Sequence, residues 1–136
     1  MKKFIKNFAI IFFFGTALFL NSCQKDNGTT DTDARTKFVG SWFCVEQSTL
    51  SYTVNISLDP SNSSQILLNN FHYQGDNEKA YATATESSFS IPYQGMCNNA
   101  IHVHGTGNFI NANKLTVIYY VNNQSDVDTI SATYTK

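Results

Sequence analysis

The sequence predicts an all-β domain: a small antiparallel up-and-down barrel of about eight strands, with a flattened two-sheet β-sandwich as the alternative. Three observations lead to this prediction. Apolar and polar residues alternate with a period of two over most of residues 38–135, as they do in strands with one buried face. Turn-forming residues separate these runs at hairpin length, and no run after residue 37 has helical periodicity. An antiparallel meander of this size hides its edges completely only by closing into a barrel.

The expected strands follow one another along the chain from residue 38. The first carries Trp42, Cys44 and Glu46 on one face, and residues 50–58 alternate apolar and polar side chains without a fault. Asp59-Pro60-Ser61-Asn62 then predicts a turn, because proline suits the second position of a type I turn. The same alternation predicts the later strands at residues 65–69, 79–85, 88–93, 100–110, 114–121 and 127–135.

Two positions predict irregular strands. Pro92 cannot donate a ladder hydrogen bond, and it predicts an edge or a bulge in a strand whose Phe89, Ile91 and Tyr93 share one face. Gly105-Thr106-Gly107 lies inside an expected strand, where glycine is typical of a bulge or of a tight bend at a barrel corner.

The first 22 residues predict a secretory signal peptide. Three lysines precede an almost wholly apolar run at residues 8–20, which is short for a membrane span. The run closes in Leu20-Asn21-Ser22-Cys23, which resembles the lipobox of bacterial lipoproteins. This resemblance implies that Cys23 begins the mature chain, carries acyl chains such as palmitate and holds the protein on a membrane; two or more chains anchor stably. The alternative is an uncleaved signal anchor.

A polar segment separates the anchor from the expected barrel. Residues 23–36 contain almost nothing apolar and predict a flexible tether, which leaves residues 37–136 for the β-barrel domain. Gln24-Lys25-Asp26-Asn27 resembles the surface-export signal of Bacteroidetes-type lipoproteins. That resemblance implies an outer-membrane location and leaves the periplasmic and surface-facing orientations open.

Charge and cysteine content narrow the function classes. Without the three lysines of the signal, six of the nine basic residues remain against ten acidic ones, so no basic patch supports nucleic-acid binding. Cys44 and Cys97 remain after Cys23, and two thiols in an exported chain predict one disulfide. Such a bond would contribute on the order of 4 kcal/mol to the free energy of unfolding. Two free buried thiols, or one reactive cysteine, are the alternatives.

Aromatic residues are the candidate ligand-binding groups. Phe38-Val39-Gly40-Ser41-Trp42 is similar to the opening Gly-x-Trp motif of lipocalins and other calycins. This resemblance implies that the tryptophan plugs one end of the barrel and that the interior holds a small apolar ligand. It also implies kinship with the small lipocalin-like domains of Bacteroidetes lipoproteins. Aromatic rings at a barrel mouth hold apolar ligands or stack on sugars, and the candidates are Trp42, Tyr52, Tyr81 and Tyr119.

No metal site or cofactor is predicted. His102 and His104 point to one face of a strand, and His72 is a conceivable third zinc ligand. However, Ile101 and Val103 favour the core, which places both histidines on the outer surface without a further ligand at suitable spacing.

No catalytic residue is predicted either. Asp126, Asp128 and Glu78 lie in or beside turns, and nothing indicates that they converge across a cleft. We therefore expect a non-enzymatic, lipid-anchored envelope domain that binds a small apolar ligand or an envelope protein. A packed interior is favoured, because small barrels are normally filled by their own side chains. The alternative is an enzyme-inhibitor or accessory subunit that presents a loop to a partner protein.

Overall fold

The computed structural model describes residues 32–47 and 49–136. The predicted signal peptide, Cys23 and residues 24–31 of the predicted tether lie outside the described residues. Among the described residues, no helix has both the length and the apolar character that crossing a bilayer requires.

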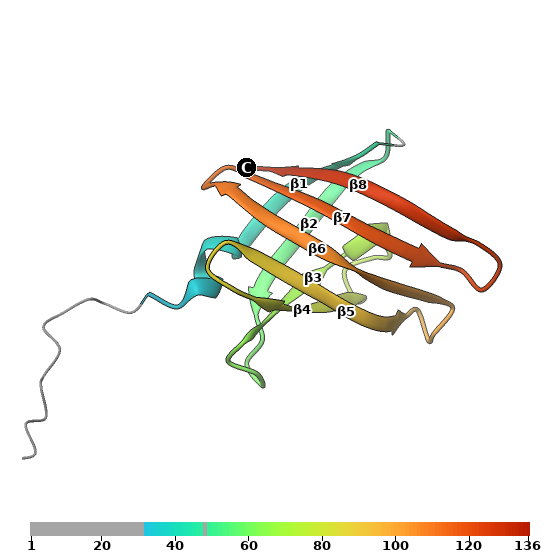
Figure 1. Ribbon diagram of the computed structural model, residues 1–136, viewed down its shortest axis with the longest axis horizontal. Helices are drawn as coiled ribbons and strands as arrows, with labels where there is room; N and C mark the ends of the chain where they lie inside the picture. The colour runs from blue at the N-terminus through green and yellow to red at the C-terminus, as the bar shows by residue number, and fades with distance from the viewer. Residues whose placement is uncertain (1–31, 48) are drawn as a thin grey trace, which may run out of the picture. The chain divides into compact units, whose positions relative to one another are not determined.

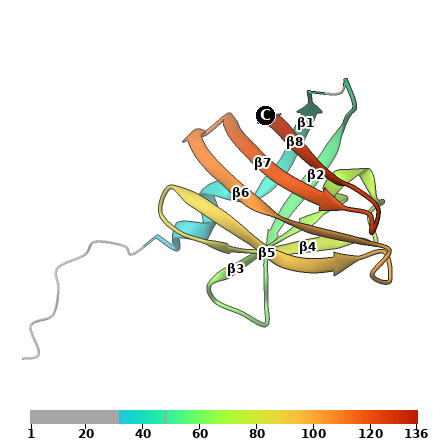
Figure 2. The ribbon, with the colours of Figure 1, turned by 45° about the vertical axis from the view of Figure 1, so that its right-hand side comes forward.

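Eight strands form a closed antiparallel barrel in which neighbours in the sequence are neighbours in space (Figure 1 and Figure 2). The last strand pairs with the first, with Cys44 opposite Tyr134, so the sheet closes on itself. The prediction of an up-and-down barrel is confirmed, and the sandwich alternative is excluded. The strands are β1 (Gly40–Glu46), β2 (Ser51–Leu58), β3 (Gln65–Asn69), β4 (Lys79–Ala84), β5 (Ser88–Met96), β6 (Ile101–Asn111), β7 (Lys114–Asn122) and β8 (Val127–Thr135).

The barrel interior is built from the alternate residues of each strand. In β2, Tyr52, Val54 and Ile56 are buried while the residues between them face outward. In β4 the interior positions are Ala80 and Ala82, both completely buried. Burial of each large aliphatic side chain contributes about 1.5–3 kcal/mol to stability. The described residues from 32 to 136 belong to one compact unit, which contains this core.

A short 3-10 helix, η1 (Ala34–Phe38), covers one end of the barrel. Phe38 is fully buried and packs edge-on against Phe89, with ring centroids 5.4 Å apart. The indole N–H of Trp42 donates to the carbonyl oxygen of Phe38 at 2.7 Å, and the Lys136 ammonium lies 4.2 Å from the indole centroid. The helix also includes residues 34–36, so ordered structure begins within the last residues of the predicted tether.

A second 3-10 helix, η2 (Phe71–Tyr73), follows β3 at the opposite end of the barrel (Figure 1). His72 and Tyr73 have positive φ angles of 52° and 55°, so the chain turns sharply here. This turn directs Phe71 inward, where it is fully buried with its ring centroid 4.6 Å from that of Tyr119.

The predicted irregularity at Pro92 is confirmed as a shift in the pairing of β5 with β6 between Ile91 and Gln94. The prediction that Tyr93 shares a face with Phe89 and Ile91 is wrong. The bulge reverses the alternation after Ile91, so that Tyr93 is 60% exposed and Gln94 turns inward. The amide of Gln94 there bonds both the N–H and the carbonyl oxygen of Tyr81.

The two glycines of β6 make room for neighbouring groups. The pairing of β6 with β7 runs without a shift through Gly105 and Gly107, so neither glycine is a bulge in that ladder. A Cβ atom at Gly107 would lie 2.1 Å from an atom of the Phe89 ring, and one at Gly105 would lie 2.4 Å from the carbonyl oxygen of Ile118. Glycine is therefore required at both positions for close packing.

Candidate functional site

The structure separates the four predicted ligand-binding residues. Trp42 and Tyr119 are fully buried in the interior, and Tyr52 is 6% exposed there. Tyr81 lies on the outer surface, where it is 39% exposed, because Ala80 and Ala82 take the interior positions of β4. The three interior aromatic rings contact other core side chains, so they pack the barrel instead of lining an open calyx.

A buried polar cluster lies beneath η2. It consists of Glu46, Tyr52, Tyr119 and His72. The Glu46 side chain is 1% exposed, and its Oε1 accepts hydrogen bonds from the hydroxyls of Tyr52 and Tyr119, each at 2.5 Å. Nδ1 of His72 lies 2.8 Å from the Tyr119 hydroxyl oxygen and 3.5 Å from Oε1 of Glu46. The single hydroxyl proton of Tyr119 goes to the carboxylate, so Nδ1 of His72 is the donor to Tyr119.

The cluster holds a carboxylate and two neutral tyrosines. Burial would raise the pKa of Glu46, but the hydrogen bonds involving His72, Tyr119 and Tyr52 together lower that pKa below its ordinary value. Burial is also the main reason why the pKa values of Tyr52 and Tyr119 are raised. Each donor in this cluster is already engaged with an acceptor. The arrangement therefore fixes η2 to the barrel wall through His72 and Tyr119.

The predicted disulfide between Cys44 and Cys97 is wrong, because both cysteines are free. Cys44 faces the interior from β1, and burial raises the pKa of its thiol to about 11. Cys97 follows β5 in the turn to β6, and its thiol donates to Oε1 of Gln74 at 3.1 Å. Strands β1 and β5 are on opposite sides of the closed barrel, with three strands between them in either direction. Cysteine count alone carries no information about this separation.

A second feature, on the outer surface, is a row of four aromatic side chains that runs over β5, β6 and β7. The row consists of Tyr93, His102, His104 and Tyr120. The Tyr93 ring stacks on His102 with centroids 5.0 Å apart and planes 11° apart, and it also lies 5.9 Å from His104. His104 in turn stacks on Tyr120 at 4.8 Å and 15°. Tyr93 is 60% exposed and Tyr120 is 37% exposed, so both present ring surface to solvent.

Local strand geometry explains how this aromatic row forms. Val103 is fully buried, and this inward position places His102 and His104 outward, as the alternation predicted. His104 is directly opposite Tyr120 in the ladder between β6 and β7. Tyr93 joins the row only because the bulge at Pro92 reverses the alternation of β5.

The structure does not bring the three histidines together as metal ligands. His72 belongs to the polar cluster beneath η2, while His102 and His104 pack against the Tyr93 ring on the outer surface. Among residues 32–47 and 49–136, no three His, Cys, Asp or Glu side chains are grouped so that they could hold a metal ion.

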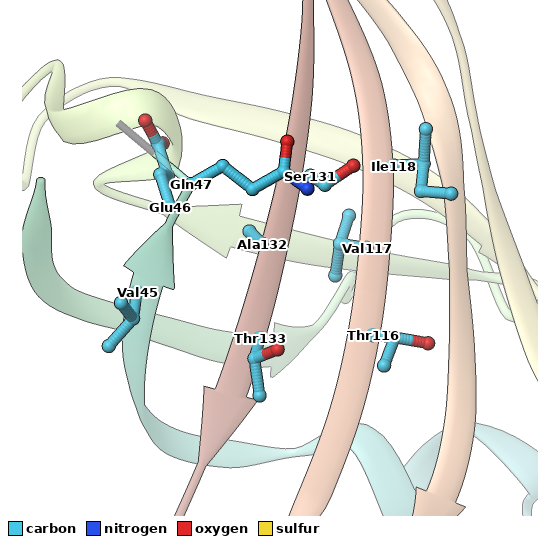
Figure 3. Close-up of a pocket in the computed structure, with 9 residues that line it drawn as sticks. All are labelled: Val45, Glu46, Gln47, Thr116, Val117, Ile118, Ser131, Ala132 and Thr133. Carbon is cyan, nitrogen blue, oxygen red and sulfur yellow. The ribbon is translucent and has the colours of Figure 1, made fainter. Parts of the chain in front are cut away.

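The aromatic row borders a shallow trough on the outer surface. One depression of about 680 Å³ is lined by Tyr93, His104, Thr106, Ile118 and Tyr120 together with Ser90, Ile91 and Gly105. A second depression, of about 370 Å³, extends over β7, β8 and β1 (Figure 3). Ile118 lines both depressions, so they adjoin at this residue, and the two together are called the trough. The second is also lined by Val45, Glu46, Gln47, Thr116, Val117, Ser131, Ala132 and Thr133.

The acidic residues considered in the sequence have simple surroundings. Asp126 and Asp128 are exposed at the turn between β7 and β8 and the start of β8. Glu78 precedes β4, and its Oε2 accepts a hydrogen bond from the backbone N–H of Cys97 at 3.1 Å. Glu78 therefore supports the turn after β5.

Comparison with known proteins identifies the fold alone. No protein-family model matches the sequence, and no curated protein matches it. Among solved structures, a redesigned β-barrel is similar to this chain with a TM-score of 0.51, over 76% of this chain and 95% of that chain. The two sequences are 10% identical. The chain is thus similar in architecture to a small closed β-barrel.

Proposed function

We propose that this protein is a lipid-anchored, non-enzymatic binding domain of the cell envelope, and that it contacts its ligand with the outer surface of β5–β8. One observation carries the proposal. The interior positions are filled by packed side chains, whereas the outer surface presents a row of aromatic rings beside a trough.

The anchor is supported by the sequence. The lipobox-like segment ending at Cys23 supplies a site for acyl chains, and the polar residues that follow it separate the membrane from the barrel. Two acyl chains hold a protein on a bilayer with an affinity that one chain does not reach. A binding domain on such a tether stays at the envelope while its surface remains accessible.

The packed interior argues against a carrier that encloses an apolar ligand. Such a ligand would have to displace completely buried residues such as Phe71 or Tyr119. Losing the packing of one large aromatic side chain costs about 3–5 kcal/mol. Entry beneath η2 would also break the hydrogen bond from His72 to Tyr119. A ligand on the outer surface requires neither change.

The outer surface has the opposite properties. Tyr93 and Ile118 are 60% and 48% exposed, although burial of such side chains is favourable. Stacking against His102 and His104 holds the Tyr93 ring in place, so little side-chain entropy is lost when a ligand covers it. Exposed and fixed aromatic rings are typical of binding surfaces.

The single tryptophan makes the location of binding measurable. Trp42 is buried inside the barrel, so a brominated fatty acid, which quenches tryptophan only at close range, would quench it if it entered the interior. We expect residues 31–136 to show no saturable quenching of Trp42. Saturable one-to-one quenching would contradict the proposal and favour an interior carrier.

The anchor is tested separately in the native host. Mass spectrometry is expected to find residues 1–22 removed and acyl chains on Cys23. A Cys23→Ser variant should leave the membrane fraction. An unprocessed, unacylated native chain would contradict the lipid anchor.

A further inference from the structure

We propose that the trough beside the aromatic row is a binding surface for an uncharged oligosaccharide, with Tyr93 and Tyr120 as its stacking residues. This inference rests on the proposed function and names the chemical class of its ligand. Four properties of the surface lead to it: fixed aromatic rings, a high density of hydroxyl groups, the absence of Asp, Lys and Arg side chains, and length.

The aromatic rings suit the C–H face of a sugar. Tyr93 and Tyr120 are held by stacking on imidazole rings with interplanar angles of 11° and 15°, and both remain partly exposed. Tyrosine offers an apolar ring together with a hydroxyl group at its tip. A pyranose ring has the matching pair of properties, since it carries C–H groups on its faces and hydroxyl groups at its edge. An aliphatic chain would not use the tyrosine hydroxyls.

Hydroxyl groups accompany the rings along the whole trough. The outward side chains that line it include apolar residues such as Ile118 and several short hydroxyl residues. Each serine or threonine hydroxyl can donate one hydrogen bond and accept others, as sugar hydroxyls do. The hydroxyl residues are Ser90 and Thr106 in the first depression and Thr116, Ser131 and Thr133 in the second.

Charge distinguishes this surface from the other depressions of the barrel. The trough is lined by one acidic residue, Glu46, whose carboxylate faces the interior cluster, and by one basic residue, His104, which is stacked on Tyr120; no Asp, Lys or Arg side chain lines it. The depression beside Tyr81 contains Asp59 and Lys79, and the one beside η1 contains charged residues as well. An ionic ligand would gain nothing from the trough, so an uncharged one is favoured.

The extent of the trough favours a chain over a single sugar ring. It runs from Tyr93 on β5 to Val45 on β1 and so crosses five neighbouring strands. With about 4.8 Å between neighbouring strands, the path along the curved barrel wall is roughly 19 Å and follows half of the circumference. A chain of several sugar rings that follows this curvature would contact both depressions.

The test is calorimetric titration of the 136-residue chain with a panel of hexasaccharides. The neutral members are cellohexaose, laminarihexaose, maltohexaose, mannohexaose and xylohexaose, and polygalacturonate serves as the charged comparison. The protein is kept in a polyoxyethylene detergent, because detergents with sugar headgroups would compete. We expect saturable binding of at least one neutral hexasaccharide and no binding of polygalacturonate.

Two pairs of matched tyrosines locate the site. Tyr93→Ala and Tyr120→Ala should each weaken binding by about tenfold, whereas Tyr93→Phe should retain most of it because the ring remains. The controls are Tyr73→Ala and Tyr81→Ala. Tyr73 is 62% exposed, against 60% for Tyr93, and Tyr81 is 39% exposed, against 37% for Tyr120. Neither control should change the affinity, since both residues lie outside the trough. Circular dichroism checks that each variant is folded.

Three results would overturn the inference. The first is that no neutral hexasaccharide binds at millimolar concentration, and the second is that binding survives the double substitution of Tyr93 and Tyr120 by alanine. The third is self-association that Tyr93→Ala abolishes without any sugar binding, which would assign the face to a second copy of the chain. That third result would leave recognition by the outer surface intact. Saturable quenching of Trp42 by a fatty acid would instead contradict the proposed function itself.

Discussion

Tyr119 and Tyr120 are neighbours on β7, yet they belong to two different regions of the molecule. Tyr119 is fully buried and hydrogen-bonded to Glu46 and His72, whereas Tyr120 is 37% exposed and stacked on His104. The difference follows from the alternation of side chains along a strand. It shows that one residue type supports the interior on one face of β7 and is available for recognition on the other.

Replacing Tyr119 or Tyr120 by alanine should give the largest difference in stability between the two faces of β7. Tyr119→Ala is expected to lower the free energy of unfolding by about 3–5 kcal/mol, because it leaves a cavity and removes one of the two tyrosine donors to Glu46. Tyr120→Ala should cost less than about 1 kcal/mol, since the site is partly exposed. Denaturant titration of both variants measures the difference. Equal losses would contradict the division of β7 into a structural and a recognition face.

Removal of the hydroxyl groups alone should give a smaller contrast. Tyr119→Phe keeps the ring but deprives Glu46 of a donor and His72 of its acceptor, so we expect a loss of about 1.5–3 kcal/mol. Tyr120→Phe should change stability by no more than about 0.5 kcal/mol. The measurement is again denaturant unfolding, at neutral pH. A negligible effect of Tyr119→Phe would show that the cluster does not stabilise the barrel.

Acid should weaken the interior cluster by protonating Glu46. The pKa of Glu46 is lower in the folded protein than its ordinary value of 4.5, so the ionised carboxylate favours the folded state. This contribution is present above pH 4.5 and is lost as the pH falls through the lower folded pKa. Glu46→Gln should therefore be less stable at neutral pH and should lose less stability on acidification. The free energy of unfolding of both proteins is measured between pH 7 and pH 3. If it falls equally in the Glu46→Gln variant and in the unchanged protein, the expectation is contradicted.

Cys44 and Cys97 should differ in reactivity, and this difference can be measured without a substitution. Cys97 is partly exposed and should react with a maleimide in the folded protein, whereas Cys44 is completely buried with its pKa raised to about 11. We expect Cys44 to react only after unfolding. Peptide mass spectrometry with and without denaturant identifies which cysteines carry a label. If neither Cys44 nor Cys97 is labelled even when the native chain is unfolded without reductant, the two form a disulfide.

The interior of the barrel was largely predictable from the sequence, because alternation determines which face of a strand is buried. The period of two correctly placed Trp42, Tyr52 and Glu46 on buried faces, and it placed both histidines of β6 outward. Turns of hairpin length then determined the order of the strands. These are local properties, so a single sequence contains them.

The candidate site was less predictable, because it depends on contacts between distant segments. An irregularity at Pro92 was predicted. Which face Tyr93 takes depends on where the extra residue of the bulge lies, and the sequence does not show that position. Tyr81 and Tyr119 were both candidate ligand-binding residues, although they lie on opposite faces of the barrel wall. The small residues Ala80 and Ala82 at the alternate positions of this strand already indicated that Tyr81 faces outward. The adjacent Tyr119-Tyr120 pair was the available signal, since two neighbours in a strand cannot both face inward.

Nuclear magnetic resonance of β7 during sugar titration tests the central claim most directly. The neutral hexasaccharide of highest affinity is added to the isotopically labelled protein, and side-chain signals are followed along the strand. We expect the signals of Ile118 and Tyr120 to shift in a saturable manner, while those of Leu115 and Tyr119, which are fully buried and line neither depression, remain in place. Shifts confined to Leu115 and Tyr119 would place the ligand inside the barrel and contradict recognition by the outer surface.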